Sequence, residues 1–162
     1  MNTFCNVESP IGRLLLTSDA TALTGLFTRP EHKGYSTDGW AQDAGIAPLA
    51  AASLQLTEYF AGTRRAFDLP MRLDGTPFQQ RVWHELLEIP YGDTWSYGQL
   101  AKRIGNPNAS RAVGLANGQN PISILVPCHR VIGADGSLTG YGGGLERKSW
   151  LLAHEGLYQV LH

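Results

Sequence analysis

The chain has 162 residues, of which 43% are hydrophobic, and its 13 basic and 14 acidic residues give a formal net charge of −1 at pH 7. This length and composition suit a globular protein of one domain, or of two small domains packed together, with a sizeable core. A net charge near zero excludes the strong overall positive charge of many nucleic-acid-binding proteins, so any contact with DNA must come from a local patch.

The sequence contains no apolar stretch of the length that a membrane span requires, and its N-terminus lacks the pattern of a signal peptide. We therefore expect a cytoplasmic protein with no membrane partner. The two cysteines, Cys5 and Cys128, lie far apart in the sequence and do not make a disulfide framework, which suits a reducing compartment. Cys128 is thus expected to remain a thiol.

Residues 1–74 predict a small α/β domain in which nothing indicates catalysis. Its predicted elements are, in chain order, a β-hairpin over 3–17, a strand over 22–27, a loop over 28–46 with at most one short strand, a helix that Pro48 opens and Gly62 ends, and a strand over 67–73. Cys5 is expected to be a core residue. Asp74 and Gly75 form the predicted junction to the second domain.

Residues 75–162 change to a helical periodicity. Capping boxes at 76–79 and 96–99 each predict the start of a helix, and a third helix is expected to begin near Asn108 or Ala109. The second and third helices, joined by a turn at Gly105, predict a helix-turn-helix, a motif that binds DNA but also occurs as plain packing. The third helix carries mostly small side chains, which allow close approach to DNA, with Arg111 as its long cationic residue.

Six basic residues in the second half of the chain could supply a positive patch for DNA, although a solvated surface of mixed charge explains them at least as well. They are Lys102, Arg103, Arg111, Arg130, Arg147 and Lys148. Charge alone therefore leaves the partner open.

Residues 120–131 carry the predicted chemistry. An apolar run between two prolines ends on Cys128, with His129 as its next neighbour, and predicts a fully buried strand with the thiol at its edge. A lone buried cysteine is more often an inert core residue. The adjacent imidazole, the proline-fixed backbone and a glycine-rich segment downstream favour instead an activated nucleophile in a pocket.

The segment 127–131, Pro-Cys-His-Arg-Val, resembles the active-site signature of the 6-O-alkylguanine-DNA alkyltransferase family, and Asn120 and Pro121 match the family's Asn-Pro. The likeness extends from about Thr76 to Gly156. It implies an α+β or α/β architecture in which a small N-terminal sheet-plus-helix domain, residues 1–74, packs on a mainly helical domain, residues 75–162, with a winged-helix-like helix-turn-helix.

The resemblance implies a direct-reversal DNA repair protein. It would flip 6-O-methylguanine, and also 4-O-methylthymine, out of duplex DNA and transfer the alkyl group irreversibly to Cys128 in one suicide turnover. The matching residues are Cys128, His129, Glu155 and Asn120 for catalysis, Tyr97, Val131, Tyr141 and Gly142 for the substrate pocket, and Ser110, Arg111, Ala112, Gly114 and Ala116 for DNA. Gly142 departs from the serine of many relatives.

The family also implies how these residues act. The glutamate matching Glu155 holds the histidine matching His129, which draws the thiol proton through a bound water, and the asparagine matching Asn120 fixes the turn before the cysteine. A relay agrees with bare geometry, because adjacent side chains in an extended segment point to opposite faces. Arg111 would replace the flipped nucleotide in the stack, and Tyr97 would help to turn it out.

We expect no cofactor and no metal, because Cys5 has no second thiol near it for the structural zinc of some alkyltransferases. The expected partner is double-stranded DNA with alkylated bases, bound by a monomer without an obligate protein partner, and cooperativity on DNA stays open. Two other functions remain open from the residues. A Cys-His hydrolase would turn over on an acyl substrate, and a helix-turn-helix regulator would bind DNA without using Cys128.

Overall fold

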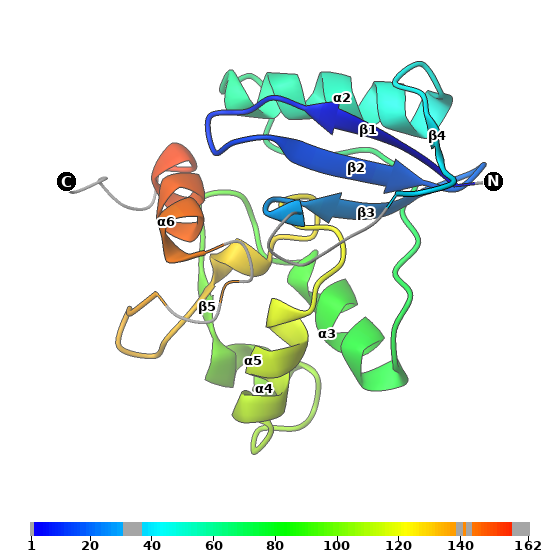
Figure 1. Ribbon diagram of the computed structural model, residues 1–162. Helices are drawn as coiled ribbons and strands as arrows, with labels where there is room; N and C mark the ends of the chain where they lie inside the picture. Colours follow the sequence, from blue (N-terminus) through cyan, green and yellow to red (C-terminus); the bar gives the residue numbers. More distant parts are fainter. Residues whose placement is uncertain (1, 31–36, 139–140, 142–143, 157–162) are drawn as a thin grey trace. The chain divides into compact units, whose positions relative to one another are not determined.

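The computed structural model describes residues 2–30, 37–138, 141 and 144–156. The chain divides into two compact units, Met1–Leu73 and Asp74–His162. Figure 1 shows strands in the first unit and mainly helices in the second, which confirms the predicted mixture of α and β structure. Among the described residues, no helix is both long enough and apolar enough to span a membrane.

The first unit is a sheet with one helix against it. The sheet has the order β3-β2-β1-β4, and its strands are β1 Thr3–Val7, β2 Leu14–Ser18, β3 Leu23–Phe27 and β4 Ala41–Gln42. Strands β1 to β3 pair antiparallel, and β4 pairs parallel with β1. Helix α2, Ala47–Phe60, has Pro48 in its first turn and packs on β1 and β2. The predicted hairpin, third strand, short strand and helix are all present.

The strand predicted over 67–73 is absent as a strand. Met71 forms an isolated bridge with Leu23, held by hydrogen bonds of 2.8 Å from Leu23 N to Pro70 O and from Arg72 N to Leu23 O. Partly buried residues do alternate with exposed ones along this segment. Pro70 has no N–H to donate to a ladder, so the alternation reports burial against the sheet edge without continuous strand pairing.

The second unit is built mainly from helices. They are α3 Pro77–Leu86, α4 Tyr97–Arg103, α5 Ser110–Gly118, the 3₁₀ turn η1 Cys128–Arg130 and α6 Leu145–His154. Two short strands, β5 Trp95–Ser96 and β6 Val131–Ile132, pair in parallel. Both predicted capping boxes form, at Thr76 and at Ser96. The buried indole of Trp83 donates to the Ala116 carbonyl over 2.8 Å, which fastens α3 to α5.

The strand predicted before the cysteine is wrong, although its apolar residues are mainly buried. Residues 122–126 form a tight turn with one isolated bridge between Ser123 and Val126, and Ile124 has a φ of 73°. The side chain of Asn120 accepts from Ile122 N over 3.0 Å and donates to Val126 O over 2.8 Å. Because Asn120 satisfies backbone groups that a ladder would need, the turn can be buried without a neighbouring strand.

Candidate active site

Cys128 opens η1, directly after the turn that Asn120 organises. Its backbone N–H donates to Val126 O over 2.8 Å, and its carbonyl accepts from the side chain of Asn117 over 3.2 Å. The residue is 3% exposed. Cys128 and His129 lie in a 3₁₀ turn and not in the extended segment that the sequence predicted. That their side chains diverge, and therefore need a water between them, follows instead from the geometry of this turn. Successive side chains in such a turn still point about a third of a turn apart.

A buried carboxylate joins the two residues that follow Cys128. Glu155, at the C-cap of α6, lies 2.8 Å from His129 through Oε2 and Nε2. Its Oε1 accepts from Arg130 Nε over 2.8 Å, and its Oε2 accepts from Arg130 Nη2 over 3.1 Å. The structure thus brings His129 and Glu155 together, with Arg130 as a third partner whose role the sequence did not indicate.

The protonation states follow from burial and these contacts. Burial lowers the pKa of His129, although the hydrogen bond and charge of Glu155 oppose it. Burial would raise the pKa of Glu155, but the hydrogen bonds and charges of His129 and Arg130 outweigh it and lower that pKa to about 2. We assign an ionised Glu155 that accepts the Nε2–H of a neutral His129. Nδ1 is then the basic atom, and it makes no hydrogen bond to any described residue.

Lys148 is a buried cation of the same site. Its side chain projects from α6, is fully buried, and donates from Nζ to the carbonyl of Val131 over 2.5 Å. Its Nζ lies 5.8 Å from the ring centroid of Tyr97. Burial lowers the pKa of Lys148 to about 8, and the charge of Cys128 acts in the opposite direction. A cation within reach of the thiol favours the thiolate.

The burial of Arg130 and Lys148, which are 6% and 0% exposed, removes both from the basic surface patch considered from the sequence. The sequence held one indication that Lys148 is buried, because it lies on the same helical row as Leu145 and Leu152. A lysine on the apolar side of a helix is either extended to solvent or paired inside the core, and only the structure decides between them. Arg130 carried no comparable signal, because it continues a turn whose geometry was not predicted.

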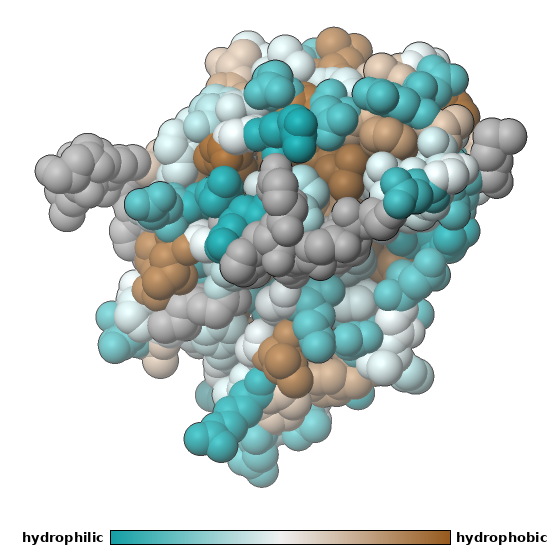
Figure 2. Space-filling view, viewed as in Figure 1, coloured by the Kyte–Doolittle hydropathy of each residue, from teal (hydrophilic) through white to brown (hydrophobic). Residues whose placement is uncertain are grey.

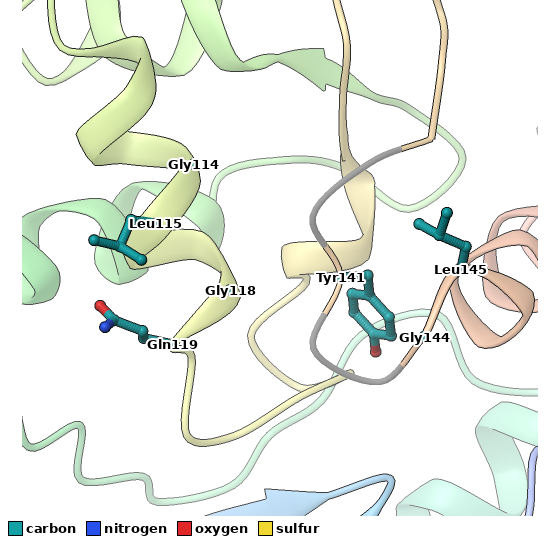
Figure 3. Close-up of a pocket in the computed structure, with 7 residues that line it drawn as sticks. All are labelled: Gly114, Leu115, Gly118, Gln119, Tyr141, Gly144 and Leu145. Atoms are coloured by element: carbon teal, nitrogen blue, oxygen red, sulfur yellow. The ribbon is translucent and has the colours of Figure 1, made fainter. Parts of the chain in front are cut away.

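Of the predicted substrate residues, Tyr141 lines a cavity of about 470 Å³, whereas Tyr97 and Val131 do not belong to its lining. Figure 3 shows Tyr141 between α5 and the start of α6, across from Leu115 and Gln119. The cavity is lined by Gly114, Leu115, Gly118, Gln119, Tyr141, Gly144 and Leu145. Burial, followed by the charge of Cys128, raises the pKa of Tyr141 well above its ordinary value, so its hydroxyl stays protonated. Gly142 lies outside the described residues.

Helix α5 presents only part of its predicted DNA surface. Arg111 and Ala112 are exposed, while Ser110 and Gly114 are half-buried. Ala116 is 2% exposed and belongs to the core, whereas Leu115, which the sequence analysis passed over, is 66% exposed. A Cβ on Gly114 would lie 3.7 Å from the Tyr97 ring, which is an ordinary contact. On the face that Figure 2 shows, hydrophilic and hydrophobic residues are interspersed.

Cys5 belongs to the first unit. It lies in β1, is 2% exposed, and its Sγ is 3.8 Å from the hydroxyl of Ser53 on α2. Burial raises its pKa, although the contact with Ser53 acts in the opposite direction. In the described ranges, no group of three or more His, Cys, Asp or Glu side chains is arranged to hold a metal ion.

Two family models match the chain, one for each unit. Residues 5–73 match the 6-O-methylguanine DNA methyltransferase ribonuclease-like domain, and residues 77–157 match the DNA binding domain of the same family. The chain is 54% identical over 149 residues to a Mycobacterium tuberculosis methylated-DNA–protein-cysteine methyltransferase, covering 92% of this chain and 89% of that relative. It is 52% identical over 150 residues to a Methanosarcina acetivorans protein of the same name, covering 92% and 95%.

Solved structures are similar to this one throughout. The M. tuberculosis O6-methylguanine methyltransferase superposes with a TM-score of 0.85 at 51% identity, covering 96% of this chain and 93% of that one. M. tuberculosis OGT in complex with DNA gives a TM-score of 0.87 at 52% identity, covering 94% and 92%. The fold of both units is therefore that of these proteins.

Proposed function

Because the chain belongs to the 6-O-methylguanine DNA methyltransferase family, we propose that it repairs alkylated DNA by moving the alkyl group onto Cys128. Its activity is that of a methylated-DNA–protein-cysteine methyltransferase. The observation that carries the residue assignment is the Glu155–His129 pair, which leaves Nδ1 as a base beside Cys128 in the chain. We assign no cofactor to this reaction.

The chemistry is one displacement. The thiol proton of Cys128 passes through a bound water to Nδ1 of His129, since the two side chains diverge within the 3₁₀ turn. The thiolate then attacks the alkyl carbon, the bond from that carbon to the guanine 6-oxygen breaks, and its electron pair stays on the base, which is protonated to guanine. The new bond from sulfur to the alkyl carbon is a thioether, which water does not hydrolyse. Cys128 is therefore not regenerated, and the protein is inactive after one transfer.

Lys148 and Glu155 support the charged states of this step. The ammonium group of Lys148 stabilises the thiolate before attack, because an opposite charge nearby favours the ionised form. Glu155 stabilises the imidazolium that forms when His129 takes the proton. Neither residue reacts with the substrate in this mechanism.

The target base must leave the stack first, because a thiol in a protein pocket cannot reach the 6-oxygen inside a duplex. We place α5 against the DNA, with Arg111 and Ala112 exposed at its start and Leu115 exposed one turn further on. Arg111 fills the space of the flipped nucleotide, and Tyr97 assists the rotation. The cavity beside Tyr141 is the entrance for the extruded base.

Specificity in this scheme comes from the lesion and not from base sequence. With a net charge of −1, the chain neutralises few phosphates, so affinity for undamaged DNA is expected to be about micromolar or weaker at physiological salt. An alkylated, mispaired base costs less to unstack than a normal one. We propose a cytoplasmic monomer that acts on 6-O-methylguanine and also on 4-O-methylthymine.

A stoichiometry experiment tests this function. The protein is incubated with a fivefold excess of duplex carrying one 6-O-methylguanine, and the restored guanine is measured after digestion of the DNA. We expect a plateau at one guanine per protein. Continued turnover would indicate a hydrolase-like enzyme, and binding without any restored guanine would indicate a regulator; either result contradicts the proposal.

A further inference from the structure

Arg130 is a buried arginine whose three guanidinium nitrogens all have partners. Nε and Nη2 donate to the two oxygens of Glu155 over 2.8 and 3.1 Å, and Nη1 donates to the carbonyl of Ile89 over 2.7 Å. The guanidinium carbon lies 5.6 Å from the ring centroid of Tyr91. The side chain is thus fixed from three directions, by the end of α6, by the segment that follows α3 and by an aromatic ring.

This contact differs from an ordinary surface ion pair. Arg64 in the first unit makes a similar pair of contacts, from Nε to Glu58 Oε1 over 2.9 Å and from Nη1 to Ala66 O over 2.8 Å, but the side chains of Arg64 and Glu58 are both partly exposed. Exposed pairs contribute little, because water competes for both charges. Around Arg130 the carboxylate is fully buried, so its two oxygens have only the partners that the protein supplies.

The carboxylate of Glu155 is shared unequally between its two neighbours. Oε1 accepts from Arg130 Nε, whereas Oε2 accepts from Arg130 Nη2 and lies 2.8 Å from His129 Nε2. A bidentate fork fixes the plane of a carboxylate as well as its position. Arg130 therefore determines the direction in which Oε2 faces the imidazole.

We propose that Arg130 is a positioning residue that holds Glu155 ionised and aimed at Nε2 of His129, which keeps the imidazole neutral with Nδ1 as its basic atom. The consequence for catalysis rests on the proposed function, because it assumes that His129 accepts the proton of Cys128. The effect on the imidazole itself needs neither DNA nor an alkyl donor.

The charges around His129 give the physical reason. Arg130 on η1 and Lys148 on α6 are cations, Glu155 on α6 is an anion, and Cys128 precedes the imidazole on η1. Burial lowers the pKa of His129, Glu155 opposes this, and Arg130 and Lys148 act with burial. Without Arg130 the uncompensated carboxylate would draw a proton onto the imidazole, and an imidazolium has no lone pair with which to accept the thiol proton.

Histidine ¹⁵N NMR on the full chain at a series of pH values tests this inference directly. In the wild type we expect a protonated Nε2 and an unprotonated Nδ1 of His129 at pH 7. Arg130→Gln removes the cation and should raise the titration midpoint of His129 by about one pH unit or more. Arg130→Lys keeps the charge but loses the fork, so it should keep a neutral imidazole while both tautomers become visible.

The rate at which iodoacetamide modifies Cys128, followed by peptide mass across the same pH range, gives a second readout. Arg130→Gln should shift the acid limb of this profile upward by about one pH unit, whereas Arg130→Lys should lower the rate about three- to tenfold without a shift. Arg64→Gln is the matched control, because it removes an arginine that also contacts a glutamate through Nε and a carbonyl through Nη1 in the other unit, and its profile should superimpose on that of the wild type.

An unchanged tautomer and an unshifted profile in Arg130→Gln, with only a uniform loss of rate, would show a merely structural role and overturn the inference. If thermal unfolding shows that Arg130→Gln does not fold, Arg130→Lys provides the test. A wild-type tautomer of His129 and a wild-type rate of Cys128 modification in Arg130→Lys would then refute the inference. Neither readout uses DNA. Failure of methyl transfer from DNA in the wild type would therefore contradict the proposed function and leave this inference standing.

Discussion

The two cysteines are buried to the same degree and differ in almost every other respect. Cys5 and Cys128 are 2% and 3% exposed. Cys5 lies in the regular strand β1, faces the hydroxyl of Ser53 at 3.8 Å, and has its pKa raised by burial. Cys128 opens a 3₁₀ turn, precedes a histidine that is paired with a carboxylate, and acts electrostatically on Lys148. Exposure alone would not have distinguished the two thiols.

The difference shows what makes a buried thiol reactive. Burial opposes ionisation, so a thiol among apolar groups and one hydroxyl stays protonated. A base and a cation within the same buried site reverse that effect. We expect the reactivity of the two cysteines to follow these neighbours.

The largest effect is expected for Cys128→Ser. Transfer from duplex with 6-O-methylguanine should become undetectable, because an alcohol is too weakly acidic to give a usable anion near pH 7. Cys5→Ser should transfer at the wild-type rate. Retained transfer in Cys128→Ser, measured as restored guanine, would remove the basis of the comparison.

Glu155→Gln should slow the reaction at Cys128 about 100-fold, with DNA and with a free alkylated base alike, because the amide no longer stabilises a protonated His129. Rapid-quench kinetics on the two substrates measure the effect. A loss confined to DNA would place Glu155 in DNA binding and not in activation of the thiol. The free base is the informative substrate, since it bypasses flipping.

The buried pair should also make stability depend on pH. The pKa of Glu155 is about 2 in the folded chain against 4.5 as its ordinary value, so its contribution of about 3 kcal/mol is present above pH 4.5 and lost as the pH falls toward 2. The pKa of His129 is also lowered in the folded chain, so the free energy of unfolding falls further as the pH drops below about 6.5. Urea unfolding between pH 7 and 3 should show this slope, and Glu155→Gln should reduce it. An equal slope in both proteins would contradict the assignment.

Arg111→Ala should leave both thiols unchanged and slow only the DNA reaction, by about tenfold, because Arg111 is exposed at the start of α5, where we propose that it fills the space of the flipped nucleotide. The exposed Arg13 of the first unit is the control, and Arg13→Ala should react like the wild type with both substrates. Equal losses on DNA and free base for Arg111→Ala would instead place this residue in the chemistry.

The smallest effect is expected for Cys5→Ala, which should lower the free energy of unfolding by about 1 kcal/mol through lost packing in the core of the first unit. Its transfer rate should stay at the wild-type value. Urea denaturation with a parallel transfer assay would measure both. A slower transfer would mean that Cys5 is more than a core residue.

The sequence predicted the elements whose signals are local. The capping boxes at Thr76 and Ser96, the proline at the start of α2 and the alternation of β1 to β3 all specify structure over a few residues. The signature around Cys128 likewise pointed to the family that the comparisons show.

The predictions from sequence were wrong where a contact between distant residues, or a contact made by a side chain, determines the backbone conformation or the burial of a residue. The apolar run before Cys128 has the composition of a strand, yet the amide of Asn120 closes it into a turn. The segment around Met71 alternates like a strand, yet Pro70 interrupts its pairing. Arg130 and Lys148 were considered as surface cations, and their burial depends on partners distant in the sequence, Glu155 for Arg130 and the Val131 carbonyl for Lys148.

The most direct test of the central claim is a competition between the two cysteines within one molecule. The wild-type chain is reacted to completion with duplex carrying one ¹³C-labelled 6-O-methylguanine, and the tryptic peptides containing Cys5 and Cys128 are quantified by mass spectrometry. The structure predicts one labelled methyl group per chain, carried entirely by the Cys128 peptide. Label on the Cys5 peptide, or label divided between the two, would contradict the claim that their surroundings make only Cys128 the acceptor.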